Sequence, residues 1–181
     1  MTTQTPGRGV SAVGEPHEGE ARPGPAPALF APSPEFAITV FGTPAPQGSK
    51  SAFRNQHTGR IQQVESSKKV KPWREAVRST VADALALVDG FTPLDCPLEL
   101  EMVFTLQKPA SAPKRRRIWP MRTPDLSKLA RSTEDALKDA GLYADDARIV
   151  RYRNLAKVYP REDVDALAAP GVVLRVWAVT G

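Results

Sequence analysis

The stretch from Thr123 to Val150 constrains the fold more than any other part of the chain. Its sequence, TPDLSKLARSTEDALKDAGLYADDARIV, predicts a helix, a glycine stop and the start of a strand. Apolar and small residues recur at intervals of three and four, which indicates one buried helical stripe. The stripe comprises Leu126, Leu129, Ala130, Thr133, Leu137 and Ala140. Pro124 suits the first turn of a helix, and Gly141 is the residue expected just past a helix end.

Acidic residues occupy two places in the same stretch. Asp125 and Asp135 share a helix face with Lys128 and Arg131, away from the apolar stripe, and Asp145–Asp146 stand at the junction with the strand. The two places converge if the strand pairs beside the helix. Mg²⁺ prefers a few carboxylate oxygens together with water and phosphate. The stretch therefore predicts a magnesium site built from Asp125, Asp135, Asp145 and Asp146.

The rest of the chain supplies further strands and a second helix. β-branched and aromatic residues predict a first strand at 35–42, strict alternation predicts another at 97–107, and the last two fall at 148–160 and 171–179. A helical stripe runs through 72–88. The element order is β-α-β-α-β-β. We expect an α+β fold, with a four-stranded mixed sheet, two main helices packed on one face and a wetter opposite face.

Composition indicates where the folded domain begins and in which compartment the protein is expected. Residues 1–34 are rich in proline and glycine and poor in large apolar residues, which predicts a disordered tail ahead of one domain at 35–181. A single cysteine, Cys96, excludes an internal disulfide framework and a multi-cysteine zinc site. The chain has no long apolar run of the kind that spans a membrane or forms the hydrophobic region of a signal peptide. We expect a cytoplasmic protein with no membrane partner.

The formal net charge of +5 favours a polyanionic partner, nucleic acid first. Between the first strand and the helix at 72–88 lies a long polar loop whose spread cations would suit a phosphate-contacting arm; a solvated loop is the alternative. The cations of this loop predicted to bind DNA are Lys50, Arg54, Lys68 and Lys69.

A second basic loop precedes the central helix. Because like charges repel and stabilise nothing, its basic cluster indicates phosphate contacts. The predicted DNA-binding residues here are Lys114, Arg115, Arg116 and Arg117, and Lys128 joins them from the helix. Trp119 lies among them, and it would either stack on a base or anchor the loop to the core.

Between about residues 36 and 179 the chain resembles the RusA family of Holliday-junction resolvases, small dimeric endonucleases common in phages and prophages. The family pattern is a helix start Asp-x-Asp-Asn/Lys-Leu-x-Lys, then Asp-Ala-Leu, a turn with glycine, and Asp-Asp-x-x-Val leading into a strand. This chain carries Asp125-Leu126-Ser127-Lys128-Leu129-Ala130-Arg131, Asp135-Ala136-Leu137, Gly141 and Asp145-Asp146-Ala147-Arg148-Ile149-Val150. The loops PKRRR and PAPQGSK also resemble those of phage members.

The resemblance implies roles for individual residues. The first aspartate of the family's helix corresponds to Asp125, and the catalytic aspartate before the strand corresponds to Asp146, with Asp145 beside it. The family's catalytic lysine falls on Arg131, which keeps the charge but cannot lose a proton. The second aspartate of the pair falls on Ser127, a neutral residue. Either Asp135 or Asp145 then supplies the missing charge, or metal affinity is reduced, or the protein binds junctions without cutting well.

The resemblance thus implies a homodimeric endonuclease that uses Mg²⁺, with Mn²⁺ as the other candidate, and cuts four-way DNA junctions by paired nicks in recombination and repair. If the chain is encoded by a phage, its compartment is the cytoplasm of the bacterial host. Three alternatives stay open. They are a non-catalytic or weakly catalytic binder of branched DNA, a metal-dependent nucleotide pyrophosphatase, and a structural domain with a solvated acidic loop.

Overall fold

A computed structural model describes residues 32–48, 50–54, 61–65, 68–113 and 116–180. The chain divides into two units at Pro32/Ser33, and the account below concerns the second unit. The predicted tail at 1–34 therefore lies almost entirely outside the described residues, as do Lys114 and Arg115. Among the helices in the described ranges, none has the length and apolar character needed to cross a bilayer.

The fold is built on a four-stranded mixed sheet, as predicted. Its strands are β1 (Phe36–Phe41), β4 (Leu98–Thr105), β5 (Ile149–Val158) and β6 (Gly171–Ala178), arranged in the order β1-β6-β4-β5. β6 pairs antiparallel with both β1 and β4, whereas β4 and β5 are parallel. A parallel pair needs a crossover connection, and α2 provides it.

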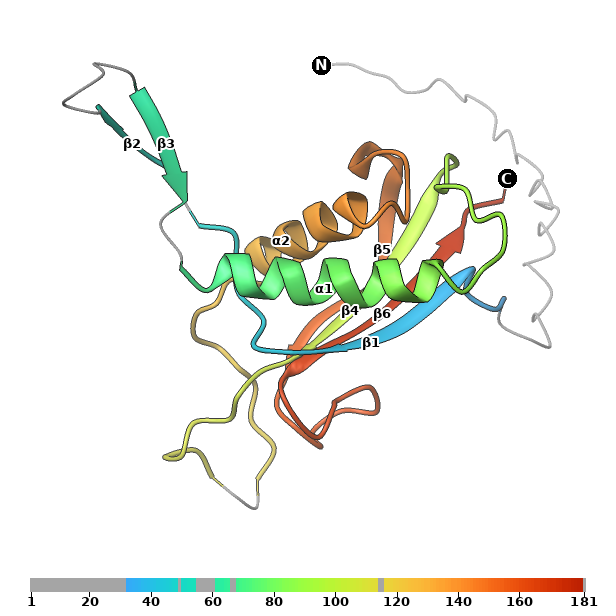
Figure 1. The fold of residues 1–181 in the computed structure, drawn as a ribbon. Coiled ribbons are helices and arrows are strands. Elements are labelled where there is room, and N and C mark those ends of the chain that lie inside the picture. The colour runs from blue at the N-terminus through green and yellow to red at the C-terminus, as the bar shows by residue number, and fades with distance from the viewer. Residues whose placement is uncertain (1–31, 49, 55–60, 66–67, 114–115, 181) are drawn as a thin grey trace, which may run out of the picture. The chain divides into compact units, whose positions relative to one another are not determined.

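Two helices, α1 (Val70–Leu85) and α2 (Leu126–Asp139), lie against one face of this sheet (Figure 1). The alternation in β4 sends Leu98, Leu100, Met102 and Phe104 into the core. On α1 the buried stripe includes Trp73, whose indole N–H donates to the hydroxyl of Thr133 on α2 at 3.2 Å. The predicted element order β-α-β-α-β-β is confirmed for the main sheet and its helices.

The start of α2 differs from the prediction. Asp125 has an extended backbone, with φ −70° and ψ 134°, so it precedes the helix as its N-cap residue, and the first helical residue is Leu126. Pro124, joined to Thr123 by a cis peptide bond, therefore lies outside the first turn. Six residues of α2 are buried: Leu129, Ala130, Ser132, Thr133, Ala136 and Leu137.

The opposite face of the sheet is polar but closed over β4, where all eight residues are buried. The Glu99 carboxylate accepts from Arg151 at 2.8 Å and from Arg153 at 2.7 Å. The Arg153 guanidinium also lies 4.1 Å from the centroid of the Trp177 ring. Buried carboxylates persist when paired, and these partly exposed arginines cover Glu99 on the face that the sequence predicted to be the wetter one.

The long polar loop after β1 contains a strand pair that the sequence did not predict. β2 (Lys50–Arg54) and β3 (Ile61–Glu65) form an antiparallel two-stranded sheet of their own. Their sequences, KSAFR and IQQVE, lack the apolar alternation that marks a half-buried strand. The hairpin is defined by its backbone pairing. Lys50 and Arg54, two of the predicted DNA-binding residues, lie at the ends of β2.

Candidate active site

The site is built where β5 begins beside the third turn of α2. In the pairing of β4 with β5, two register shifts occur, between Leu98 and Glu99 and between Leu100 and Glu101. Each shift inserts one extra residue into β5, and such bulges re-aim side chains. As a result Tyr152 pairs with Leu100, a residue of the helix-facing core, and its hydroxyl reaches α2.

Glu134 of α2 is the residue that Tyr152 reaches. The Tyr152 hydroxyl donates a hydrogen bond to the Glu134 carboxylate. Both side chains line a pocket of about 460 Å³, together with Asp146. The hydroxyl of the buried Tyr143 also donates a hydrogen bond, to the backbone carbonyl of Glu134 at 2.8 Å. Two tyrosines therefore fix the position of this acid at the rim of the pocket.

Electrostatics mark Glu134 and Asp146 as an acid pair. Burial raises the pKa of the Glu134 carboxyl above its ordinary value, and the negative charges of Asp146 and Asp135 raise it further. The hydrogen bond from Tyr152 and the positive charge of Arg131 act in the opposite direction. Burial, with help from Glu134, also raises the pKa of Tyr152, so its hydroxyl stays protonated as a donor at neutral pH.

Asp145 has a structural task. It precedes the single turn η1 (Asp146–Arg148), where its Oδ1 accepts from the Ala147 N–H at 3.0 Å. Its Oδ2 lies 2.6 Å from the Lys138 ammonium. That ion pair, aided by the Ala147 hydrogen bond and by Asp146, lowers the pKa of Asp145 to about 2. Both oxygens are thus engaged, while Asp146 lies 3.8 Å from Lys138.

Asp125 and Asp135, the other two predicted metal ligands, lie in separate ion pairs. Asp125 is 3.2 Å from Lys128, and both side chains are about half exposed. Asp135 is 3.4 Å from Arg74 of α1, which also binds Asp139 at 2.7 Å. Arg74 therefore bridges the two helices.

The backbone before Asp125 is held from β5. The Lys157 ammonium donates to the carbonyls of Arg122 and Pro124, at 2.8 Å each. Lys157 pairs in the sheet with Phe104, so it projects on the helix-facing side. A charged donor to two carbonyls is a strong anchor. Lys157 thus fixes the entrance of α2 and, through it, Asp125.

Whether these acids suit a divalent ion can be judged from their grouping. Within the described ranges, no set of three or more acids, histidines or cysteines is arranged to hold a metal ion. The predicted four-acid set is thus not gathered as one such group, and Asp146 lies beside Glu134 instead. Two carboxylates in one pocket, one with a pKa raised by burial and then by like charge, fit Mg²⁺, which takes one or two carboxylates plus waters and phosphate.

Glu134 was not predicted as a site residue, although its spacing along the helix could have indicated it. Ser127, Arg131, Glu134 and Lys138 recur at four, three and four residues, which places them on one face of α2. Glu134 follows Ser127 by two helical turns, about 10 Å along the axis. An acid on the same helix face as the neutral Ser127 is the signal that could have predicted Glu134 as a site residue.

The predicted DNA-binding residues lie in several places. Lys68 and Lys69 precede α1, with Lys69 as its N-cap residue, and both are exposed. Arg116 and Arg117 are exposed in the basic loop. The Arg117 guanidinium lies 4.3 Å from the centroid of the Trp119 ring, which is 55% exposed. Trp119 therefore does not anchor the loop in the core.

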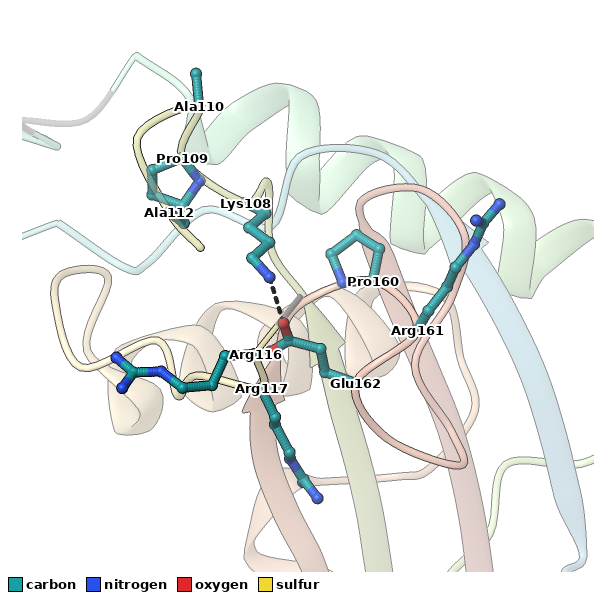
Figure 2. A pocket seen from close by; sticks show the side chains of 9 residues that line it. All are labelled: Lys108, Pro109, Ala110, Ala112, Arg116, Arg117, Pro160, Arg161 and Glu162. Atoms are coloured by element: carbon teal, nitrogen blue, oxygen red, sulfur yellow. Dashed lines mark hydrogen bonds and ion pairs between the residues drawn. The ribbon is translucent and has the colours of Figure 1, made fainter. Parts of the chain in front are cut away.

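Part of the basic cluster has a structural explanation, which the repulsion argument missed. Lys108 lies 2.5 Å from Glu162, and Arg117 lies 3.4 Å from Asp163 (Figure 2 shows the first pair). Glu162 also accepts from the Ile118 N–H at 3.3 Å, and Ile118 packs against the core. Acids of the connection after β5 thus hold the basic loop in place.

Comparison with protein families gives a match that covers the site. The model of the family described as Endodeoxyribonuclease RusA matches residues 42–165, which is more than half of the chain. No curated protein matches. The matched range includes α2, η1 and β5, and hence Glu134, Asp146 and Tyr152. The chain therefore belongs to the RusA family of endodeoxyribonucleases.

Proposed function

We propose that this protein is a Mg²⁺-dependent, structure-selective endodeoxyribonuclease that resolves four-way DNA junctions by paired nicks. Family membership supports an endonuclease acting on Holliday junctions. The observation that carries the metal dependence is the Glu134–Asp146 pair, two carboxylates that line one pocket and repel each other. A cation between them would offset that repulsion.

In this proposal Glu134 and Asp146 hold Mg²⁺, and Mn²⁺ is the other candidate. The ion, when bound, activates water and stabilises the negative charge that develops on the phosphodiester. Tyr152 orients the Glu134 carboxylate by its hydrogen bond. Arg131 is exposed on the same helix face, where its guanidinium would bind the scissile phosphate. Asp125, the counterpart of the family's first helix aspartate, would take part in catalysis at the start of α2, and Lys128 beside it would contact the DNA strand.

A homodimer would place two such sites on opposite strands of a junction, which accounts for paired nicks. We therefore expect the protein to have a mass in solution of twice the 19.7 kDa of one chain. The exposed cations at Lys68, Lys69, Arg116 and Arg117 would bind the phosphates of the arms.

The test is to incubate the protein with a synthetic mobile four-way junction, with and without Mg²⁺, and to map nicks on each strand. Asp146→Asn should abolish nicking and leave junction binding intact or tighter. The matched control is Asp139→Asn, which removes an exposed acid from the end of α2 and should cut normally. Unchanged cutting by Asp146→Asn would refute the site.

A second function is favoured by two observations. Ser127 stands where the family pattern has an aspartate, and no group of three potential ligands is present among the described residues. The protein would then bind branched DNA and cut it weakly or not at all. Tight junction binding without nicks, in either Mg²⁺ or Mn²⁺, would establish this second function.

A further inference from the structure

A second pocket lies between the basic loop and the connection that follows β5. Its volume is about 570 Å³, and its charged lining consists of Lys108, Arg116, Arg117, Arg161 and Glu162. The Lys108–Glu162 ion pair occupies its centre, with Arg116 and Arg161 on opposite sides in the view of Figure 2. The lining thus contains four cations and one acid, so the pocket is positive.

The cations of this pocket are not equally available. Lys108 is held by Glu162, with 23% and 12% of their side chains exposed, and Arg117 has Asp163 at 3.4 Å. Within the part of the chain that the structure describes, neither Arg116 nor Arg161 has an acidic partner, and both are exposed. No function was predicted from the sequence for the segment that contains Arg161. Arg161 is a free arginine beside a positive cavity.

The backbone of Arg161 provides an independent observation. Its φ is +62°, and among the described residues it alone has a positive φ without being glycine. Glycine adopts this conformation at no steric cost, so arginine is not the residue that the turn itself favours. Strained backbone of this kind clusters at ligand-binding sites, where the side chain is needed. The strain thus points to a role for the Arg161 side chain.

We propose that this pocket is a backbone-binding subsite for DNA, with Arg161 as a principal phosphate ligand. A guanidinium binds phosphate oxygens in a bidentate manner, which suits Arg161 and Arg116. Because the two arginines lie on opposite sides of the pocket, a chain of phosphates fits them better than one small anion does. The proposal rests on the proposed function in one respect, namely that the substrate is DNA.

The test is to measure binding of the full chain to a four-way junction without divalent cations, by fluorescence anisotropy over a series of salt concentrations. Arg161→Gly removes the guanidinium and suits the backbone. We expect affinity at least about threefold lower and a salt slope smaller by about one. Arg161→Lys keeps the charge but loses the bidentate fork, so its salt slope should stay close to that of wild type while its affinity falls between those of wild type and Arg161→Gly. The control is Arg78→Gln, which removes an exposed cation from α1 and should bind like wild type.

Two further outcomes decide the proposal. The melting temperature of Arg161→Gly should equal or exceed that of wild type; if it falls, Arg116→Gln replaces it as the test variant. Wild-type affinity and salt slope in these variants would overturn the subsite. Nicking is measured separately, by comparing wild type with Asp146→Asn. A wild-type protein that binds DNA through Arg161 but does not cut it would refute only the proposed nuclease function.

Discussion

The hydroxyl of Tyr152 donates a hydrogen bond to the carboxylate of Glu134, and so joins the bulged edge strand β5 to the third turn of α2. Both side chains line the pocket that contains Asp146. The hydrogen bond favours the ionised form of Glu134, whereas burial and neighbouring acids favour the protonated form. The pKa of this acid is therefore the net result of opposing effects and is raised overall, so its charge is sensitive to mutation and to pH.

Tyr152→Phe should shift the acidic limb of the pH–rate profile. Without the hydroxyl, the larger of the two effects that lower the Glu134 pKa is lost, so that pKa rises further above its ordinary value. Mg²⁺ binding requires the ionised carboxylate. Nicking should then decline at a higher pH than in wild type and approach the wild-type rate at alkaline pH. The measurement is single-turnover junction cleavage between pH 5 and 9; an unchanged acidic limb would contradict it.

Glu134→Gln should separate stability from function. The folded state binds a proton at Glu134 more tightly than the unfolded chain, so wild-type stability falls as pH rises above the unfolded pKa near 4.5. Glutamine removes this cost. We expect equal melting temperatures near pH 4, a higher one for the variant at pH 7 without Mg²⁺, and no nicking. A melting temperature below wild type at pH 7 would count against a Glu134 carboxylate destabilised by burial and by neighbouring acids.

Lys157→Met should slow cleavage more than it weakens DNA binding. The variant leaves the carbonyls of Arg122 and Pro124 without their shared donor, so the segment that places Asp125 loosens. Loss of a charged hydrogen-bond donor costs about 1.5–3 kcal/mol of stability. Saturating protein in single-turnover cleavage isolates the rate, and anisotropy reports affinity. Equal losses in both measurements would mean that Lys157 does not position Asp125.

The main fold could be predicted because its signals are hydrophobic. Alternating Leu98, Leu100, Met102 and Phe104 must face a helix layer, and a stripe of period 3.6 must face a sheet. The hairpin of β2 and β3 carries no such signal, since its residues are mostly polar. The bulges of β5 also leave no mark in the sequence, because they depend on how the strand pairs.

The site could be predicted in part. The family pattern identifies Asp146, which lines the pocket, but it also suggests Asp135 and Asp145 as replacements for the missing charge at Ser127. Those two acids lie in ion pairs with Arg74 and Lys138. Which acids are free for a metal depends on long-range pairing, and this information is absent from the spacing of residues along α2.

Gly171→Ala should destabilise the fold strongly. A Cβ atom there would lie 2.4 Å from the Val40 carbonyl oxygen, across the pairing of β6 with β1. Backbone cannot yield as a side-chain tip does, so we expect a loss of about 3 kcal/mol. Gly141→Ala is the comparison, because its φ of +83° is strained but the space around it is open, and it should cost about 1 kcal/mol. Urea unfolding gives both; equal losses would refute the clash.

Ser127→Asp tests whether Glu134 already supplies the missing charge. Ser127 is exposed in the first turn of α2, where an aspartate would interact favourably with the helix dipole by about 0.3–1 kcal/mol. If Glu134 and Asp146 hold Mg²⁺, the new carboxylate should change the nicking rate less than about threefold. That factor corresponds to about 0.65 kcal/mol of barrier.

The same variant in a Glu134→Gln background makes the test decisive. There the added aspartate should restore nicking only if a carboxylate at residue 127 can replace the one on the third turn of α2. A gain of tenfold or more from Ser127→Asp alone, about 1.4 kcal/mol, would mean that the natural protein lacks a ligand. It would then bind junctions and cut them weakly, with Ser127 as the cause.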